Sequence, residues 1–509
     1  MMVQSGARQR CVARAFALVL LVGFGGCSTA ESHRVTAPQR GGSIPALALV
    51  SSVDIEGAEV VAQLPGGERL LVAGQAGVTL VGLDVDGTAT VLRSTSFGFD
   101  AAQSVTHVTH ARGAGGVGVA TIAPADRSQR GTVVFFDPRS LAVISMVQAG
   151  FNPDAVAATD NGRWIVIANE GEPAISAGGL LADPPGSIQL LDLDGLVSAA
   201  DAREADWSQR SLMLGFDEPR LRAGIAGARI HPTHIDEPWL DIEPEYIAVH
   251  ASAAFVSLQE NNAIAVVDLD LQRIDGVHPL GVVQQRLDGR SDGSKSMRDS
   301  VATLPMSDQL ASITIGSKAY LLAANEGDPR SQLGENALAD RSSFDVLGDP
   351  AERPLEGTLW EGEPAAFGSR SLSVHALPSL ERIGDTGAQF ETMIAARYPD
   401  LFNAGGNPLT PDRRSEKRGP EPEGVVAATI GGEPFAFVSL ERPGFVAVVC
   451  LAEPVAPRVI DIIPTGRVRS SNPEGMCVID RGATAWLAVA CEGSGKLLVY
   501  RILGGEQRR

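Results

Sequence analysis

The stretch PEYIAVHASAAFVSLQENNAIAVVDL, residues 244–269, contains the pattern that decides the fold. Proline and an acidic residue precede a short apolar strand, which is followed by a turn of small residues, a second apolar strand and a loop of Gln, Glu and Asn. A third apolar segment, AIAVVDL, comes after the loop. Short runs of β-branched and aromatic residues bounded by turn residues are typical of strands. The stretch therefore predicts an antiparallel unit of three or four strands.

The same plan recurs along the chain. PDAVAATDNGRWIVIANEGEP, PEGVVAATIGGEPFAFVSLERPGFVAVV and PEGMCVIDRGATAWLAVACEGSGKLLVY, which start at Pro153, Pro422 and Pro473, repeat the Pro-acid opening, the strands and the polar loop. A copy from Ser307 lacks the proline, a copy from Gly57 keeps the strands and loses the acids, and a copy from Val105 is the weakest. Seven such units predict an all-β, seven-bladed β-propeller with loop insertions, since radially arranged sheets leave few exposed edges. A two-domain β-sandwich or a β-solenoid is the alternative.

Composition agrees with a globular β protein and limits its partners. The chain has 509 residues, of which 44% are hydrophobic, and its 56 glycines and 31 prolines are spread along the sequence. Its net charge of −19 disfavours nucleic acid as a partner, because phosphate binding needs clustered Lys and Arg. Cations or neutral ligands are expected instead.

The first residues form a targeting segment. Positively charged residues precede AFALVLLVGF, residues 15–24, an apolar run too short to span a bilayer. The run ends in GFGGCS, which resembles the lipobox of bacterial lipoproteins, so we expect Cys27 to be lipidated; plain secretion is the alternative. The predicted organisation is a lipoprotein signal peptide at 1–26, a flexible tether at 27–46 and the propeller at 47–509. The expected location is the bacterial envelope, with a membrane attachment through the N-terminal lipid.

Acidic residues recur at the start of first strands and in the loops after second strands. In an antiparallel hairpin these two places lie side by side, so acids from all units should surround one mouth of the central channel. Glycines in the same motifs let the backbone turn tightly. The candidate cation ligands are Asp154, Glu170, Glu172, Glu245, Glu260, Asp308, Glu326, Asp328, Glu423, Glu441 and Glu474, with Glu492 at the same kind of position.

Crowded carboxylates need a counter-charge. Ca²⁺ suits them, because it accepts many oxygen ligands in flexible geometry, whereas Mg²⁺ demands tighter octahedral sites. Arg330, Arg370 and Arg442 are the candidate anion-binding residues, which could supply counter-charge or hold a phosphate bidentately. The structural alternative is that the acids cap turns by accepting hydrogen bonds from backbone N–H groups.

Several strings resemble the choice-of-anchor I family. They are EPEYIAV with FVSLQENNAIAVVDL, AANEGDPR, FGSRSLSV, GDTGAQFE with YPDLFN, GPEPEGV and SLERPGFVAVV, and the matches run from about residue 152 to 500. The resemblance implies an exported bacterial protein with a propeller-like domain, similar to esterase-like phytase propellers, with some members labelled alkaline-phosphatase-like. The chain departs from the family at residues 291–300, where SDGSKSMRDS holds only Asp292 and Asp299 as acids.

Two hypotheses for function follow. In the first, the protein is a surface module that binds a glycan, a protein or a phosphorylated small molecule. In the second, it is a calcium-dependent phosphoesterase of phytase-like or alkaline-phosphatase-like type, for which no nucleophile or general base is identifiable. Two smaller expectations are an inserted helix in residues 388–403, from its apolar spacing, and either one disulfide among Cys450, Cys477 and Cys491 or three buried thiols.

Overall fold

The computed structural model describes residues 46–75, 77–100, 102–330, 355–406, 408–466 and 471–503. The chain divides into two units, Met1–Gly42 and Ser43–Arg509, and every element below belongs to the second. The predicted signal peptide, Cys27 and most of the tether lie outside the described residues. Within the described part of the chain, no helix is both long and apolar enough to cross a bilayer.

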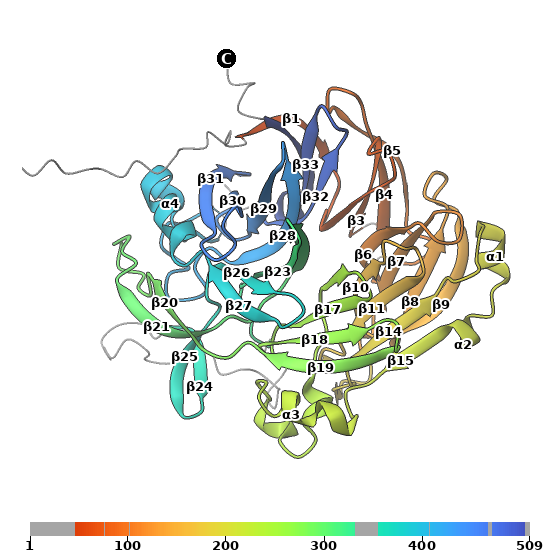
Figure 1. Cartoon of the computed structure of the whole chain (residues 1–509), viewed down its shortest axis with the longest axis horizontal. Coiled ribbons are helices and arrows are strands. Elements are labelled where there is room, and N and C mark those ends of the chain that lie inside the picture. Colours follow the sequence, from red (N-terminus) through yellow and green to blue (C-terminus); the bar gives the residue numbers. More distant parts are fainter. Residues whose placement is uncertain are drawn as a thin grey trace, which may run out of the picture. The chain divides into compact units, whose positions relative to one another are not determined.

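The second unit is all-β and consists mainly of antiparallel four-stranded sheets (Figure 1), as the sequence predicts. The first sheets are β2 (Val60–Gln63), β3 (Arg69–Gly74), β4 (Gly77–Leu83) and β5 (Ala89–Thr95); β6 (Ser104–Ala111), β7 (Val117–Ala123), β8 (Arg130–Phe136) and β9 (Val143–Phe151); β10 (Pro153–Ala158), β11 (Trp164–Asn169), β14 (Ser187–Asp192) and β15 (Ser211–Leu214); and β16 (Ile247–His250), β17 (Ala253–Leu258), β18 (Ala263–Asp268) and β19 (Arg273–Pro279).

The later sheets follow the same order. They are β22 (Leu310–Ile315), β23 (Lys318–Ala324), β26 (Leu372–Ala376) and β27 (Glu381–Asp385); β28 (Pro422–Ile430), β29 (Glu433–Leu440), β30 (Phe445–Cys450) and β31 (Arg458–Pro464); and β32 (Pro473–Asp480), β33 (Ala485–Cys491), β34 (Lys496–Leu503) and β1 (Ala46–Asp54). Strand β1 pairs antiparallel with β34, with Ala46 opposite Leu503, so a segment from the start of the unit completes the sheet made by its end.

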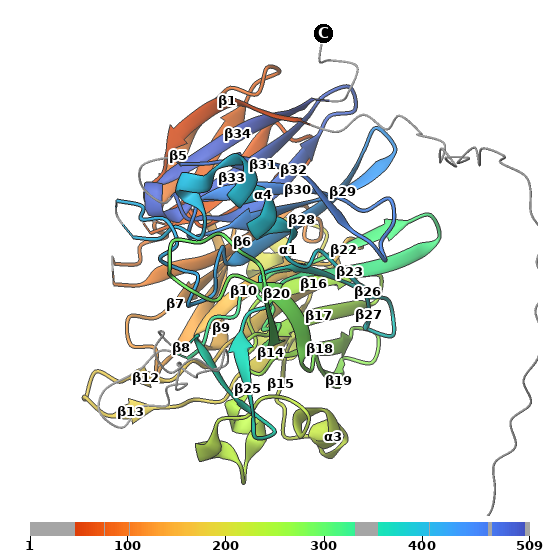
Figure 2. The ribbon, with the colours of Figure 1, turned by 90° about the vertical axis from the view of Figure 1, so that its left-hand side faces the viewer.

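The first strands of successive sheets contact one another in turn. Strand β2 contacts β6, β6 contacts β10, and the series continues through β16, β22, β28 and β32, which contacts β2. The inner strands therefore return on themselves around a centre, which is the arrangement of a β-propeller. Figure 2 shows the same sheets after a turn of 90° from the view of Figure 1.

Alternate side chains of the central strands pack into different apolar clusters. In β7, Val117 and Val119 pack with Ile165 and Ile167 of the following sheet. Ala120 and Ile122 of the same strand pack with residues of the preceding sheet. This period of two follows from the strand pleat. These apolar layers between sheets are the core. Each fully buried Val, Leu or Ile in them stabilises the fold by roughly 1.5–3 kcal/mol.

Insertions decorate the propeller where the sequence has long connections. A mixed sheet of β20 (Val283–Leu287), β21 (Asp299–Leu304), β25 (Glu363–Phe367) and β24 (Gly357–Trp360) contains the parallel pair β21–β25. The helix expected in residues 388–403 is present as α4. The other small elements are β12 (Ala174–Ile175), β13 (Leu181–Ala182), α1 (Ala199–Glu204), α2 (Trp207–Arg210), α3 (Arg222–Ile225), α4 (Gln389–Arg397), η1 (Pro219–Leu221), η2 (Pro232–His234), η3 (Pro238–Asp241), η4 (Pro399–Leu401) and η5 (Glu492–Ser494).

The three C-terminal cysteines are free thiols, and Cys491 is fully buried. Burial raises the pKa of Cys477 and of Cys491 to about 12. No disulfide links Cys450, Cys477 and Cys491, and the alternative of three buried thiols holds for Cys491, whereas Cys450 and Cys477 are partly exposed.

Candidate cation-binding site

The acids that open the first strands enter the centre through irregularities in the strand pairing. The register of β10 against β11 shifts between Pro153 and Ala155, which leaves Asp154 as the extra residue. The same shift surrounds Glu423 in β28 and Glu474 in β32. A β-bulge of this kind bends the strand and redirects its side chain. The recurring Pro-acid motif thus places an acidic residue at a bulge, where its carboxylate is directed toward the channel.

Glycine allows neighbouring first strands to approach each other behind these acids. A Cβ on Gly424 would lie 2.2 Å from the carbonyl oxygen of Glu474, and one on Gly475 would lie 2.4 Å from that of Glu59. Glycine at these positions therefore permits close contact between sheets. Gly171 and Gly327 lie in the loops after second strands and have φ values of +73° and +94°. Residues with a side chain rarely adopt such values, so here the turn itself favours glycine.

Acids from strand starts and loops line one cavity of 240 Å³ at the centre, which we call the central cavity. Its predicted members are Asp154, Glu170, Glu245, Asp308, Glu326, Asp328, Glu423, Glu474 and Glu492, and Gln259 and Tyr246 also line it. Of the remaining candidates, Glu172 and Glu260 line an adjoining pocket of 160 Å³, and Glu441 lies beside Glu423 and Glu474. The structure therefore gathers all the predicted acids at one mouth; their binding of a cation stays a prediction.

The acids around the central cavity form a ring, and one of them, Glu59, was not predicted from the sequence. The copy from Gly57 was expected to lack acids, yet Glu59 directly precedes β2 and lines the central cavity. That expectation was wrong, because an acid next to the strand is present in this copy too. The pair Glu59-Val60 was the available signal.

The weakest copy contributes a hydroxyl and a guanidinium in place of acids. Thr106 occupies the bulge position of β6, and its Oγ1 donates to the carbonyl oxygen of Pro153 at 2.6 Å. Arg127 follows β7, where other copies carry acids, and its guanidinium donates to Asn152 and to Ser104 Oγ at 3.1 Å. This sheet therefore supplies positive charge to the same face.

Burial and mutual repulsion disfavour ionisation of the carboxyls in the ring. Burial raises the pKa of Glu59 to about 8, and Asp154 and Glu492 add to the effect. It raises the pKa of Glu441 to about 8 although Arg442 opposes the shift. The pKa of a further group of carboxyls lies well above the ordinary range, because burial and neighbouring carboxylates destabilise their charged forms. These are Glu245, Asp308, Glu423 and Glu474.

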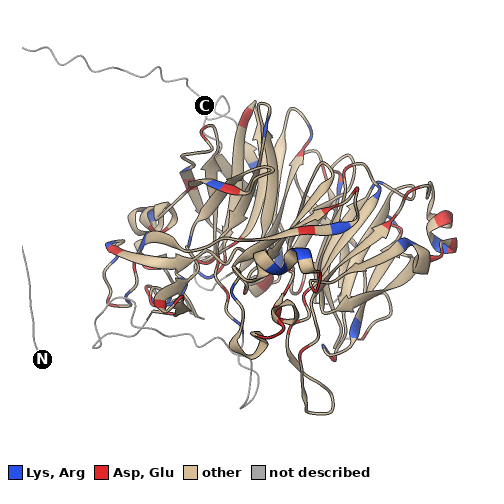
Figure 3. Cartoon of the chain, turned by 60° about the horizontal axis from the view of Figure 1, so that its bottom comes forward, with Lys and Arg blue, Asp and Glu red and all other residues tan. Residues whose placement is uncertain are grey.

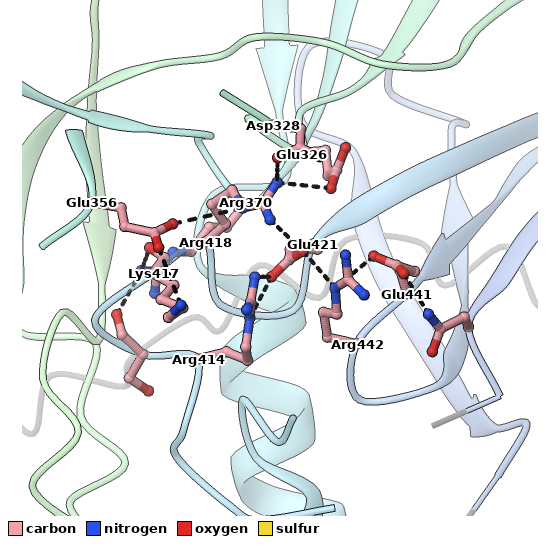
Figure 4. Close-up of polar contacts among 12 residues, drawn as sticks. Glu326, Asp328, Glu356, Arg370, Arg414, Lys417, Arg418, Glu421, Glu441 and Arg442 are labelled. Carbon is pink, nitrogen blue, oxygen red and sulfur yellow. Dashed lines mark hydrogen bonds and ion pairs between the residues drawn. The ribbon is translucent and has the colours of Figure 1, made fainter. Parts of the chain in front are cut away.

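Arginines neutralise one side of the ring (Figure 4). The guanidinium of Arg418, only 7% exposed, pairs with Asp328, with Glu326 at 3.3 Å and with Glu421 at 3.3 Å. Glu421 is also paired with Arg414, and Arg442 lies 3.0 Å from it. Sequence reasoning did not identify Arg418, Arg414 or Glu421 as part of the site, although Glu421 lies within the quoted GPEPEGV string. We call Arg414, Arg418, Glu421 and Arg442 the arginine cluster.

The proposed anion-binding arginines are all engaged with protein groups. Arg330 is buried and its Nε lies 2.9 Å from Glu243 Oε1. Arg370 is buried, pairs with Glu391 at 2.8 Å and donates to three carbonyl oxygens of the insertions. Arg442 bridges Glu421 and Glu441 and keeps 34% of its side chain exposed. The anion-binding role stays a prediction.

Two groups of carboxylates among the described residues have the spacing of metal ligands. Oxygens of Glu423, Glu441 and Glu474 come within 4.8 Å of one another, as do those of Glu326, Glu421 and Glu441. The second group already contains the guanidiniums of Arg418 and Arg442. Oε2 of Glu423 is buried and receives no hydrogen bond from the described residues. The first group therefore fits a hard cation better, because carboxylate oxygens are the ligands that Ca²⁺ prefers.

Three known proteins show a partial likeness to this chain. Gigasin-3a of Magallana gigas is 34% identical over 111 residues, which make up 20% of this chain and 39% of that protein. Among solved structures, the β-propeller domain of Cps50 (Swd1) from Myceliophteria thermophila has a TM-score of 0.44 and 10% identity, covering 90% of this chain and 100% of that one. Hydrazine synthase from Kuenenia stuttgartiensis has a TM-score of 0.44 and 11% identity, covering 88% and 96%.

A family match covers most of the chain. The sequence model of the choice-of-anchor I domain matches residues 59–359 and 358–454, which include the start of the first complete sheet and the sites of the ring acids up to Glu441. The motifs quoted from the sequence lie largely within these ranges. The protein therefore belongs to the choice-of-anchor I family.

Proposed function

We propose that the protein is an exported surface module, a seven-bladed β-propeller whose central cavity binds a divalent cation of the Ca²⁺ class. In this proposal Cys27 carries a lipid that holds the module at the bacterial envelope, and the mouth of the channel faces its ligand. The family supports the surface location, and the contacts from β2 through β32 and back to β2 support seven blades.

One observation carries the cation proposal. Glu423, Glu441 and Glu474 come from two adjacent sheets, and their carboxylate oxygens are within 4.8 Å of one another. These carboxylates, of which those of Glu441 and Glu474 are buried and that of Glu423 is partly buried, repel one another unless a cation or protons neutralise them. A divalent ion would be held by these three groups and by water, for which a cavity of 240 Å³ has room.

A second observation points to a missing partner. Glu423 lines the same cavity, and its Oε2 is buried and receives no hydrogen bond from the described residues. A buried carboxylate oxygen without a donor costs free energy. A cation with its water shell would supply that partner.

The phosphoesterase alternative rests on the family resemblance and on arginines near the proposed cation site. Arg330 and Arg370 each pair with a buried carboxylate, and Arg370 also donates to carbonyl oxygens. Arg442 bridges two glutamates. These contacts favour a binding module over an enzyme, since a phosphate would have to displace internal partners.

The test is calorimetric titration of Ca²⁺ into the chelator-treated mature protein. We expect one tight site, and at a Ca²⁺ concentration 100 times Kd a stabilisation of about 2.7 kcal/mol against urea. The double variant Glu423→Gln/Glu474→Gln should lose at least about tenfold in affinity, since two of three charged ligands are gone. Glu433→Gln, which alters an exposed acid at the start of β29, is the matched control. Equal affinity in the double variant would refute the site.

A further inference from the structure

Both copies of the Asn-Glu-Gly-acid-Pro loop open onto one pocket. Glu172 and Pro173 of the first loop and Asp328 and Pro329 of the second line the 160 Å³ pocket beside the central cavity, which we call the lateral pocket. The rest of its wall is Glu170, Glu243, Glu245, Gln259, Glu260 and Arg330. The repeated motif therefore builds two sides of the same site.

The lateral pocket does not have the spacing of a metal site. Among the described residues, the groups of carboxylates within 4.8 Å of one another involve Glu326, Glu421, Glu423, Glu441 and Glu474, and none of these lines the lateral pocket. A metal ion needs several oxygens at once within its first shell. The acids of this pocket are arranged for a cation wider than a bare ion.

Two carboxylate oxygens in the pocket receive no hydrogen bond from the rest of the described chain. Glu245 and Glu260 are 8% and 7% exposed, their side chains are hydrogen-bonded to each other, and Oε2 of each is buried without a donor from any other described residue. The two side chains are close enough for Glu260 to raise the pKa of Glu245, after the larger effect of burial. A single ligand with several N–H donors could satisfy both oxygens.

The protein itself shows which group suits this environment. Arg330, 3% exposed at its side chain, lies in the pocket wall with its guanidinium 2.9 Å from Glu243 Oε1 and 3.3 Å from Asp241 Oδ2. Asp328 of the same wall pairs with Arg418, which is buried and also contacts Glu326 and Glu421. A planar guanidinium is weakly hydrated and donates to several carboxylates at once, so it is suited to buried acidic sites.

We propose that the lateral pocket receives an alkylguanidinium, in the first place an arginine side chain of a partner polypeptide. Its N–H groups donate to Oε2 of Glu245 and of Glu260, and its methylene stem lies along the rings of Pro173 and Pro329. The site goes beyond the divalent-cation site and does not depend on it. It gives the surface module a partner of defined chemistry, a chain that presents arginine.

The test uses chelator-treated protein, so that metal ions do not compete. Agmatine and an end-capped Ala-Arg-Ala peptide are titrated separately and followed by calorimetry, with tetramethylammonium as a cation of equal charge that has no N–H donor. We expect both guanidinium compounds to bind and tetramethylammonium to fail. Tighter binding of the peptide assigns the source to a polypeptide, and tighter binding of agmatine assigns it to a free alkylguanidine.

Two variants locate the binding. Glu260→Gln, isosteric and uncharged, should weaken agmatine at least tenfold and leave Ca²⁺ affinity within twofold. Glu474→Gln, which lines only the central cavity, should do the reverse. The melting temperature of each variant shows that it is folded.

The inference is overturned if neither guanidinium compound binds the wild-type protein, if tetramethylammonium binds equally well, or if Glu260→Gln binds agmatine like wild type. Ca²⁺ that displaces agmatine with one-to-one competition in wild type and in Glu474→Gln would also overturn it, because the pocket would then be a metal site. Loss of Ca²⁺ binding alone refutes only the divalent site.

Discussion

Glu421 and Glu423 are two residues apart, and protein surrounds both. Their surroundings nevertheless shift the pKa values of the two carboxyls in opposite directions. Burial alone would raise the pKa of Glu421, but Arg418, Arg414 and Arg442 outweigh it and hold that pKa below its usual value. Burial raises the pKa of Glu423 well above its usual value, and Glu441 and Glu474 add to the shift. The mouth therefore has a side that carries its own counter-charge and a side that lacks one (Figure 3 shows the charged residues). Burial acts in the same direction on both carboxyls, so the neighbouring charges decide the difference between their pKa values.

Removing the internal counter-charge should have the largest effect. Arg418→Met replaces the guanidinium with an uncharged apolar chain and leaves Glu326, Asp328 and Glu421 without their shared cation. Breaking a buried ion pair by deleting one partner costs about 3–5 kcal/mol, so urea denaturation at pH 7 should show a loss of that size. Arg273→Met, which breaks the exposed pair with Asp275, is the control and should cost about 0–1 kcal/mol. Similar losses in the two variants would abolish the distinction.

Raising the pH should destabilise the cation-free protein. Carboxyls whose folded pKa is raised bind protons more tightly in the folded state, so their contribution is complete below the unfolded value near 4.5 and is lost as pH rises through the folded value. Glu326 titrates near 7 and Glu59 and Glu441 near 8, with burial as the main cause. The free energy of unfolding should fall by more than about 1.4 kcal/mol between pH 5 and pH 8. Added Ca²⁺ should reduce that fall; a curve that rises over this range contradicts the raised values.

Neutralising one uncompensated acid should stabilise the cation-free protein. Glu59→Gln removes a carboxyl whose pKa burial raises to about 8, so at pH 8 it should increase the free energy of unfolding by more than about 1 kcal/mol. At pH 5 the carboxyl is protonated in the folded state, and most of the gain should disappear. Glu421→Gln, on the compensated side, should destabilise at both pH values, since it leaves arginines unpaired. Thermal unfolding at the two pH values measures both variants.

The smallest effect is expected at the border between the two sides. Arg442→Gln removes a partly exposed guanidinium that holds Glu441 at 2.9 Å. Because its side chain is one-third exposed and solvent screens it, the cost in stability should be about 1 kcal/mol or less. Glu441 would then be released toward Glu423 and Glu474, and Ca²⁺ affinity should rise several-fold. Unchanged or weaker Ca²⁺ binding in calorimetry would place Glu441 outside the divalent site.

The fold was accessible from the sequence because each repeat carries its own signals. The Pro-acid opening, the two apolar strands and the glycine-bearing loop occur within about 25 residues in each clear copy, and these are local features. From them the common mouth followed, since strand starts and loop ends share a face. Glu59 was missed only because the motif was defined too narrowly.

The division of the mouth was not accessible, because it depends on contacts between distant residues. Arg418 meets Glu326 and Asp328 about ninety positions away in the chain, across an insertion that has no repeat pattern. Arg330 and Arg370 look like free cations in the sequence, but their burial and partners are set by such packing. No local sequence pattern distinguishes an arginine that is available to bind an anion from one that neutralises a buried acid of the protein.

Pairing of β1 with β34 has a consequence for how the protein forms. Ala46 lies opposite Leu503, so the first strand to be synthesised has no partner until almost the whole propeller has followed it. Contacts so distant in sequence form late and slowly, because the loop-closure entropy comes before any gain. Until then β1 is an unpaired edge that attracts other chains. Closure of the ring is thus a final, checkable event in folding, and a chain interrupted before β34 cannot complete it.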